Sequence, residues 1–123
     1  MAVVELTMEN INQEIQNSEI MLIDFWAPWC APCRRFAPVF EASSEQNTDV
    51  RYAKLNTEDQ PEIASEFGIQ SIPTIAVFKK QVLIFMQPGM IPDDALNDLV
   101  EKVREFDVEA AIAAEEAEKN KGN

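Results

Sequence analysis

The residues Asp24-Phe25-Trp26-Ala27-Pro28-Trp29-Cys30-Ala31-Pro32-Cys33 contain both cysteines and both tryptophans of the chain. Before them, the apolar run 20–26, interrupted only by Asp24, predicts a buried strand. After them, Pro32 occupies a position that suits the first turn of a helix. A helix beginning here places Cys30 at its N-terminus, where free amides and the helix dipole favour negative charge. The stretch therefore predicts a redox site, because a thiolate is the nucleophile in disulfide exchange.

The composition is typical of one soluble domain. The chain has 123 residues, and 46% of them are hydrophobic, which is enough to form a core that needs no disulfide cross-links to fold. A bridge between Cys30 and Cys33 closes a very short loop and stabilises little, so chemistry explains the two cysteines better than scaffolding does. The net charge of −12 argues against nucleic acid and anionic membranes as partners.

The N-terminus has neither a basic segment nor a long apolar one, and no apolar run reaches membrane-spanning length. We therefore expect a cytoplasmic protein. In a reducing compartment, a lone Cys-x-x-Cys near a βαβ pattern is typical of a redox-active pair.

Hydrophobic periodicity predicts alternating strands and helices. The expected strands are 3–6, 20–26, 50–56, 74–78 and 82–86. The expected helices are 7–17, 31–46, 61–67 and 92–106, the second kinked at Pro38 and the third ended by Gly68. This order predicts an α/β domain with parallel and antiparallel strands in one sheet and helices on both faces.

The C-terminal segment differs from the rest. We expect a domain over residues 1–106 and an acidic, Ala/Glu-rich tail over residues 107–123. Glu115 precedes Lys119 by four residues, a spacing that favours helix, but apolar residues are few. An extended helix with a frayed end is favoured over a disordered tail.

The sequence resembles thioredoxin from Val3 to about Arg104. The resemblance rests on the run 24–33, on Lys54-Leu55-Asn56, on Gly68-Ile69-Gln70-Ser71-Ile72-Pro73-Thr74 and on Gly89 before the last strong helix. It implies the thioredoxin fold: a central mixed five-stranded sheet flanked by four helices in three layers, here with an acidic C-terminal extension. The implied function is that of a thiol–disulfide oxidoreductase, a protein-disulfide reductase.

Three features depart from the family pattern. Ala31 stands where the family usually has glycine, which alters the disulfide potential or the loop shape modestly. The hairpin turn is Lys80-Gln81, where the family often has Asn-Gly. The tail beyond Phe106 is longer than in a minimal thioredoxin.

Cys30 is the expected attacking thiolate because it is nearest the helix end and follows Trp29 on an accessible loop. Cys33 lies one turn inside the helix, more buried and with a higher expected pKa, and resolves the mixed disulfide. A structural disulfide is one alternative. A metal half-site is another, although a tetrahedral zinc site needs four Cys or His ligands and the chain has no histidine and no third cysteine.

Asp24 interrupts an otherwise apolar strand, and burial raises the pKa of a carboxyl group. Such a group can take the proton of Cys33 and return it, the role that the resemblance also assigns to this residue. Lys54 matches the lysine that lies near it in the family. The alternatives are a solvated acid on an edge strand and an ordinary surface lysine.

The resemblance also implies a substrate groove. Ile72-Pro73-Thr74 matches the cis-proline loop that faces the active site, and the Ile72 backbone would pair with an extended substrate strand. An apolar groove is expected beside Cys30, with substrate-binding residues Trp29, Ala31, Pro32, Ile72, Gly89 and Met90. Trp29 could instead simply pack. Trp26 is expected to face the core, and Arg34 and Arg35 either help hold the thiolate or are ordinary surface residues.

The implied partners are disulfide-containing proteins and an NADPH-dependent thioredoxin reductase. We expect a monomer with no bound cofactor or metal, whose redox group is the Cys30–Cys33 disulfide. Two other functions stay open: a thioredoxin-fold chaperone or scaffold with incidental redox activity, and an oxidant in an oxidising compartment. The missing leader and the absence of His between the cysteines disfavour the oxidant.

Overall fold

One continuous apolar strand forms the centre of the molecule. In the computed structural model, which describes residues 3–121, six of the seven residues of β2 (Ile20–Trp26) are buried. The sheet has five strands in the order β1-β3-β2-β4-β5. β1 and β3 run parallel to β2, whereas β4 is antiparallel to β2 and β5 to β4. The other strands are β1 (Val3–Glu5), β3 (Arg51–Asn56), β4 (Thr74–Lys79) and β5 (Val82–Pro88).

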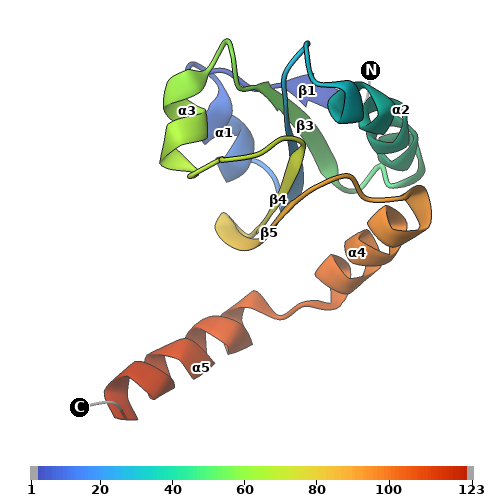
Figure 1. Cartoon of the computed structure of the whole chain (residues 1–123). Helices are drawn as coiled ribbons and strands as arrows, with labels where there is room; N and C mark the ends of the chain where they lie inside the picture. The colour runs from blue at the N-terminus through green and yellow to red at the C-terminus, as the bar shows by residue number, and fades with distance from the viewer. Residues whose placement is uncertain (1–2, 122–123) are drawn as a thin grey trace.

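Two pairs of helices cover the sheet and make the expected three layers (Figure 1). The helices are α1 (Ile11–Gln16), α2 (Ala31–Gln46), α3 (Pro61–Glu66), α4 (Asp93–Glu105) and α5 (Val108–Lys121). α2 and α4 pack on one face through Phe36, Phe40, Leu96 and Val100. α1 and α3 cover the other face through Ile11 and Ile63. The mixed five-stranded fold predicted from the sequence is confirmed.

Backbone geometry explains two element ends. Gly68 has φ +67, a left-handed conformation that suits glycine, and α3 ends just before it. The β4–β5 turn uses the same region without glycine, because Lys80 has φ +50 and Gln81 has φ +69. Two such residues in succession form the turn that matches strand twist, so the departure from Asn-Gly leaves the hairpin intact.

The C-terminal segment has a fifth helix rather than a continuation of the fourth. α4 ends at Glu105, and α5 begins at Val108 and extends away from the sheet (Figure 1). The side chain of Lys79 explains the break, because its Nζ donates to the carbonyls of Val103, Arg104 and Phe106 at 2.7, 2.9 and 2.6 Å. The four helices expected to flank the sheet are therefore present, and α5 is a separate helix within the C-terminal tail, where helix was favoured over disorder. Residues 122 and 123 of the predicted tail lie outside the described residues.

Of two further expectations about helices, the one for Phe106 was wrong and the one for Pro38 is confirmed. Phe106, expected as the last residue of the helix 92–106, instead lies in the break between α4 and α5 and is 42% exposed. Pro38 does lie inside α2, as predicted.

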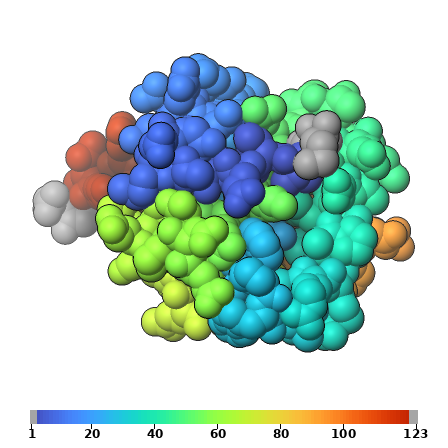
Figure 2. Space-filling view, turned by 90° about the horizontal axis from the view of Figure 1, so that it is seen from above, coloured from blue at the N-terminus to red at the C-terminus, as the bar shows by residue number. Residues whose placement is uncertain are grey.

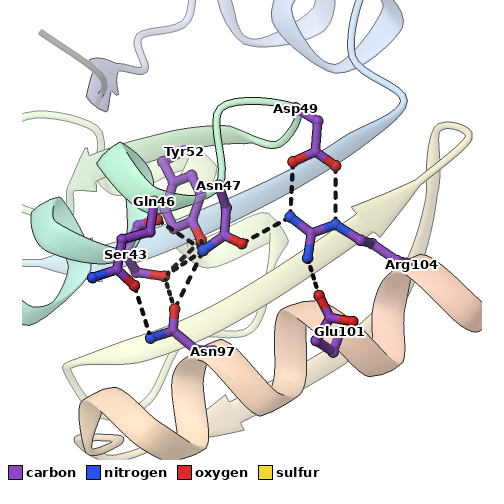
Figure 3. Close-up of polar contacts among 8 residues, drawn as sticks. All are labelled: Ser43, Gln46, Asn47, Asp49, Tyr52, Asn97, Glu101 and Arg104. Atoms are coloured by element: carbon purple, nitrogen blue, oxygen red, sulfur yellow. Dashed lines mark hydrogen bonds and ion pairs between the residues drawn. The ribbon is translucent and has the colours of Figure 1, made fainter.

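A polar network joins the second half of α2 to α4 (Figure 3). The buried Tyr52 hydroxyl lies 2.7 Å from Ser43 Oγ, which also donates to Asn97 Oδ1 at 2.9 Å. The Asn47 amide donates to Tyr52 and to Asn97, each at 3.3 Å. Beside it, Arg104 donates to Asn47, Asp49 and Glu101. Burial raises the pKa of Tyr52 and keeps its hydroxyl protonated, so it stays a donor in this network.

Candidate active site

Cys30 and Cys33 form a disulfide at the start of α2, with their Cα atoms 5.2 Å apart. Cys30 is the N-cap of the helix, with an extended backbone, and its Sγ accepts the backbone N–H of Cys33 at 3.2 Å. Pro32 occupies the first turn, as predicted. The same N–H and the helix dipole would stabilise a thiolate on Cys30 after reduction. The position at the helix start is therefore confirmed.

The exposure of the two cysteines differs less than expected. Cys30 is 4% exposed and Cys33 is 1% exposed, so Cys30 is the outer residue by a small margin. The reason is the loop before β4, whose Ile72 carbonyl oxygen lies 3.8 Å from Cys30 Sγ. Trp26 and Ile72 also pack against the two cysteines. Cys30 is therefore the more exposed of the two cysteines, as expected, although both are buried in this disulfide form.

The surface around the disulfide carries the residues expected of a groove. Trp29 is 65% exposed, so the alternative of simple packing is wrong, and Ala31 beside it is also exposed. Figure 2 looks onto this end of the molecule from above, where the loop after β2 lies at the surface between the start of α2 and the segment around α3. A shallow pocket of about 180 Å³ adjoins Trp29 and Ile72.

The residues that line that pocket are not all those expected for the substrate groove. Its remaining residues are Thr57, Ala64, Ile69, Gln70 and Ser71, from the segments around α3. Ile69, Gln70 and Ser71 belong to the run 68–74 that carries the resemblance, whereas no sequence pattern pointed to Thr57. Gly89 and Met90 do not line it. Gly89 lies on the other side of the loop before β4, where its N–H donates to the Pro73 carbonyl at 2.8 Å, and Met90 is 43% exposed.

The Ile72–Pro73 peptide bond is cis, as the resemblance implied. Pro73 is buried, and its neighbour Ile72 faces Cys30 through the carbonyl contact described above. The Ile72 N–H has no hydrogen-bond partner within residues 3–121. An unpaired amide next to the disulfide is available to an extended peptide.

Asp24 lies in the central strand and is 4% exposed, so the alternative of a solvated acid on an edge strand is wrong. Desolvation by burial raises the pKa of its carboxyl group to about 7, although the nearby Lys54 ammonium opposes the rise. Its Oδ1 has no hydrogen-bond partner among the residues that the structure describes. A carboxyl group with a pKa near neutrality can both accept and return a proton.

Lys54 is the register partner of Asp24 on the parallel strand β3. Its side chain is half-buried, and Nζ lies 5.4 Å from the centre of the Trp26 ring, a cation–π distance. Trp26 is half-buried against the cysteines, and its indole N–H is unpaired in the described part of the chain. Lys54 is therefore more than an ordinary surface lysine, and Trp26 faces the site as well as the core.

Within residues 3–121, no three His, Cys, Asp or Glu residues lie together as a metal site would need. No helix in the same region is long and apolar enough to cross a membrane.

The thioredoxin family model matches residues 2–102 of the chain. The chain belongs to the thioredoxin family. A protein of Streptomyces coelicolor provisionally named thioredoxin 2 is 47% identical over 118 residues, which are 94% of this chain and 88% of that one. The thioredoxin of Porphyra purpurea is 39% identical over 104 residues, 83% and 97% of the two chains.

Solved thioredoxin structures agree with the fold. A mutant thioredoxin from Halobacterium salinarum superposes with a TM-score of 0.77 at 30% identity, covering 81% of this chain and 88% of that one. The oxidised thioredoxin of Plasmodium falciparum superposes with a TM-score of 0.74 at 30% identity, and the match covers 82% of this chain and 97% of that one. The family membership and the Cys30–Cys33 disulfide together show that the chain is a thiol–disulfide oxidoreductase with protein-disulfide reductase activity. They do not favour the chaperone alternative, because the cysteine pair is present and bonded.

Proposed function

We propose that this thioredoxin reduces protein disulfides in two steps that start at Cys30. In the first, the Cys30 thiolate attacks one sulfur of the target disulfide. The Cys30–target bond forms, the target S–S bond breaks, and the other target sulfur leaves as a thiolate. The observation that carries this assignment is the N-cap position of Cys30, whose Sγ accepts the Cys33 N–H.

Cys33 completes the exchange. Its thiolate attacks Cys30 Sγ, re-forming the Cys30–Cys33 bond and releasing the second target thiolate, so two electrons pass to the target. The proton of the Cys33 thiol needs an acceptor in a buried site. Asp24, with its raised pKa, is the proposed acceptor, and Lys54 tunes the charge on it.

Substrate contact is proposed to centre on the exposed Trp29 and on the unpaired Ile72 amide. A carbonyl of an extended target segment would accept a hydrogen bond from that amide, and the segment would lie against Pro73. Ala31, Pro32, Gly89 and Met90 would border the segment around the disulfide.

The remaining proposals concern the protein's surroundings. Its partners are disulfide-containing proteins, and an NADPH-dependent thioredoxin reductase returns two electrons to Cys30–Cys33. We further propose a cytoplasmic monomer that needs no bound cofactor, with residues 1–106 as the redox domain. An acidic surface of net charge −12 fits a freely diffusing protein.

Insulin reduction coupled to NADPH and a thioredoxin reductase tests the proposal. The wild type should turn over NADPH, and Cys30→Ser and Cys33→Ser should each abolish turnover. Asp24→Asn should slow turnover and change its pH profile between pH 6 and 9. An unchanged profile in Asp24→Asn would remove Asp24 from the proton transfer while leaving the cysteine assignments in place.

A further inference from the structure

Two arginines beside the disulfide lack the carboxylate partners that four other basic residues have within residues 3–121. The paired residues are Arg51 with Glu14, Lys80 with Glu109, Lys102 with Asp98, and Arg104 with Asp49 and Glu101. Arg34 and Arg35 are exposed, and neither forms an ion pair within residues 3–121. The chain has 22 acidic residues for 10 basic ones, so unpaired cations stand out against an excess of carboxylates.

Both arginines lie in the first turns of α2, the helix that Cys30 caps. The Arg34 amide closes the first turn of α2 on the Cys30 carbonyl at 3.1 Å. Its guanidinium donates to the Pro28 carbonyl at 2.8 Å, a neutral acceptor that leaves its charge uncompensated. Arg35 follows Ala31 by four residues, so the two share a face of the helix. At about 1.5 Å of rise per residue, Arg35 lies only about 7.5 Å along the axis from Cys30.

The start of α2 also differs from that of the other helices. Acidic residues occupy the first turn of α1, α3, α4 and α5, whereas the first turn of α2 has none. Cations near a helix N-terminus oppose the helix dipole. The arginines are therefore placed where helix electrostatics disfavours them and where an incoming disulfide must approach.

Acidic residues also belong to a loop that adjoins the site. The loop after β3 carries the exposed acids Glu58 and Asp59, and Thr57 of that loop lines the pocket next to Trp29. At physiological ionic strength, screening limits exposed charges to a range of about 8 Å. A target bound over Cys30 therefore experiences the two arginines more strongly than the net charge of the whole protein.

We propose that Arg34 and Arg35 determine specificity, favouring target disulfides that carry an acidic residue next to the attacked cysteine. This inference rests on the proposed function. The arginines act on encounter and binding rather than on bond making, because charge complementarity at the rim of a site mainly raises the association rate.

Two disulfide-bridged fluorogenic peptides test the inference, identical except that glutamate flanks the cysteines in one and lysine in the other. The measured quantity is the ratio of their second-order reduction rates, glutamate over lysine, at physiological salt. Arg35→Glu and the double variant Arg34→Gln/Arg35→Gln should lower this ratio about three- to tenfold. Arg35→Lys should keep it near the wild-type value, and added salt should shrink the difference between wild type and variants.

Lys102→Glu is the matched control, because it changes the net charge by the same two charges on an exposed side chain of α4. An equal fall in the ratio for this control would overturn the inference, as would an unchanged ratio in both arginine variants while both peptides are still reduced. A wild type that reduces neither peptide nor insulin would instead overturn the proposed function, and the inference with it.

Discussion

Asp24 of β2 and Lys54 of β3 are register partners in the middle of the sheet, yet they form no ion pair, and Asp24 Oδ1 has no hydrogen-bond partner within residues 3–121. Lys54 lies over the Trp26 ring instead. The carboxyl group is therefore desolvated with little direct compensation, and its pKa rises to about 7. A buried ionisable group of this kind must destabilise the fold when it is charged.

Asp24→Asn should therefore stabilise the protein in a pH-dependent way. The folded pKa of about 7 lies above the ordinary value of 3.8, so the folded state binds the extra proton between these values. Wild-type stability should fall as the pH rises from about 4 to about 7. The difference between the two pKa values corresponds to on the order of 4 kcal/mol, an upper bound for the gain of Asp24→Asn above pH 7.

Urea unfolding of the wild type and Asp24→Asn between pH 4 and pH 8 measures this difference. The two free energies of unfolding should nearly coincide at pH 4 and diverge towards pH 8. Asp98→Asn, at a 64% exposed carboxylate on α4, is the control and should show little divergence. A gain of the same size at every pH would mean that packing, rather than ionisation, is responsible.

The two cysteines should behave differently as single variants. Cys33→Ser leaves Cys30 able to attack but removes the resolving thiol, so mixed disulfides should accumulate on it. Cys30→Ser should trap few targets because Cys33 is 1% exposed and lies inside the helix. Each variant is incubated with oxidised insulin. Non-reducing gels then measure the amount of mixed disulfide, and peptide mapping identifies the cysteine that carries it. Preferential trapping by Cys30→Ser would reverse the two roles.

Lys79→Met should destabilise the protein by about 2–4 kcal/mol, because it leaves three carbonyls at the end of α4 without their charged donor. Lys79 is only 7% exposed, so water cannot easily replace the ammonium. Lys80→Met is the neighbouring control, and loss of its exposed ion pair with Glu109 should change stability much less. Denaturant midpoints of both variants test this, and equal losses would contradict the assignment of the break after α4 to Lys79.

Tyr52→Phe should cost about 1–2 kcal/mol, because Ser43 and Asn47 lose a buried partner while the ring remains. A double-mutant cycle with Ser43→Ala measures the coupling. The summed losses of the single variants should exceed the loss of the double variant. Strict additivity would show that the hydroxyls do not act together.

Removal of the residues after Phe106 should leave insulin reduction within about twofold of the full chain, because α5 contributes no residue to the disulfide site. Stability should fall by about 1–2 kcal/mol, since the buried side chain of Val108, which is 4% exposed, is removed. Reduction assays and thermal unfolding of the shortened chain measure both. A large loss of activity would mean that the boundary at residue 106 is misplaced.

The sequence predicted those features that depend on local patterns. A continuous apolar run can be satisfied only by a central strand, and residues 20–26 do form one, including the buried Asp24. The helix start at Cys30 followed from Pro32, and the end of α3 followed from Gly68. These signals are contained in a few neighbouring residues.

The features that the sequence did not predict depend on contacts between residues that are distant in the chain. Nothing near Lys79 in the chain indicates that its ammonium will cap a helix about 25 residues later and so separate α5 from α4. The burial of Cys30 depends on the Ile72 carbonyl, 42 residues away. The pocket residue Thr57 comes from a segment that carries no pattern of its own.

The direction of β2 separates the two ends of the molecule. Its last residue, Trp26, leads to Cys30, whereas its first residue, Ile20, pairs with Lys79 beside the start of α5. Seven residues of strand put about 20 Å between these places. If the chain were attached through its C-terminus to a bead or an electrode, the Cys30–Cys33 pair would accordingly face the solution. The protein could then be used on a surface to capture or detect target proteins.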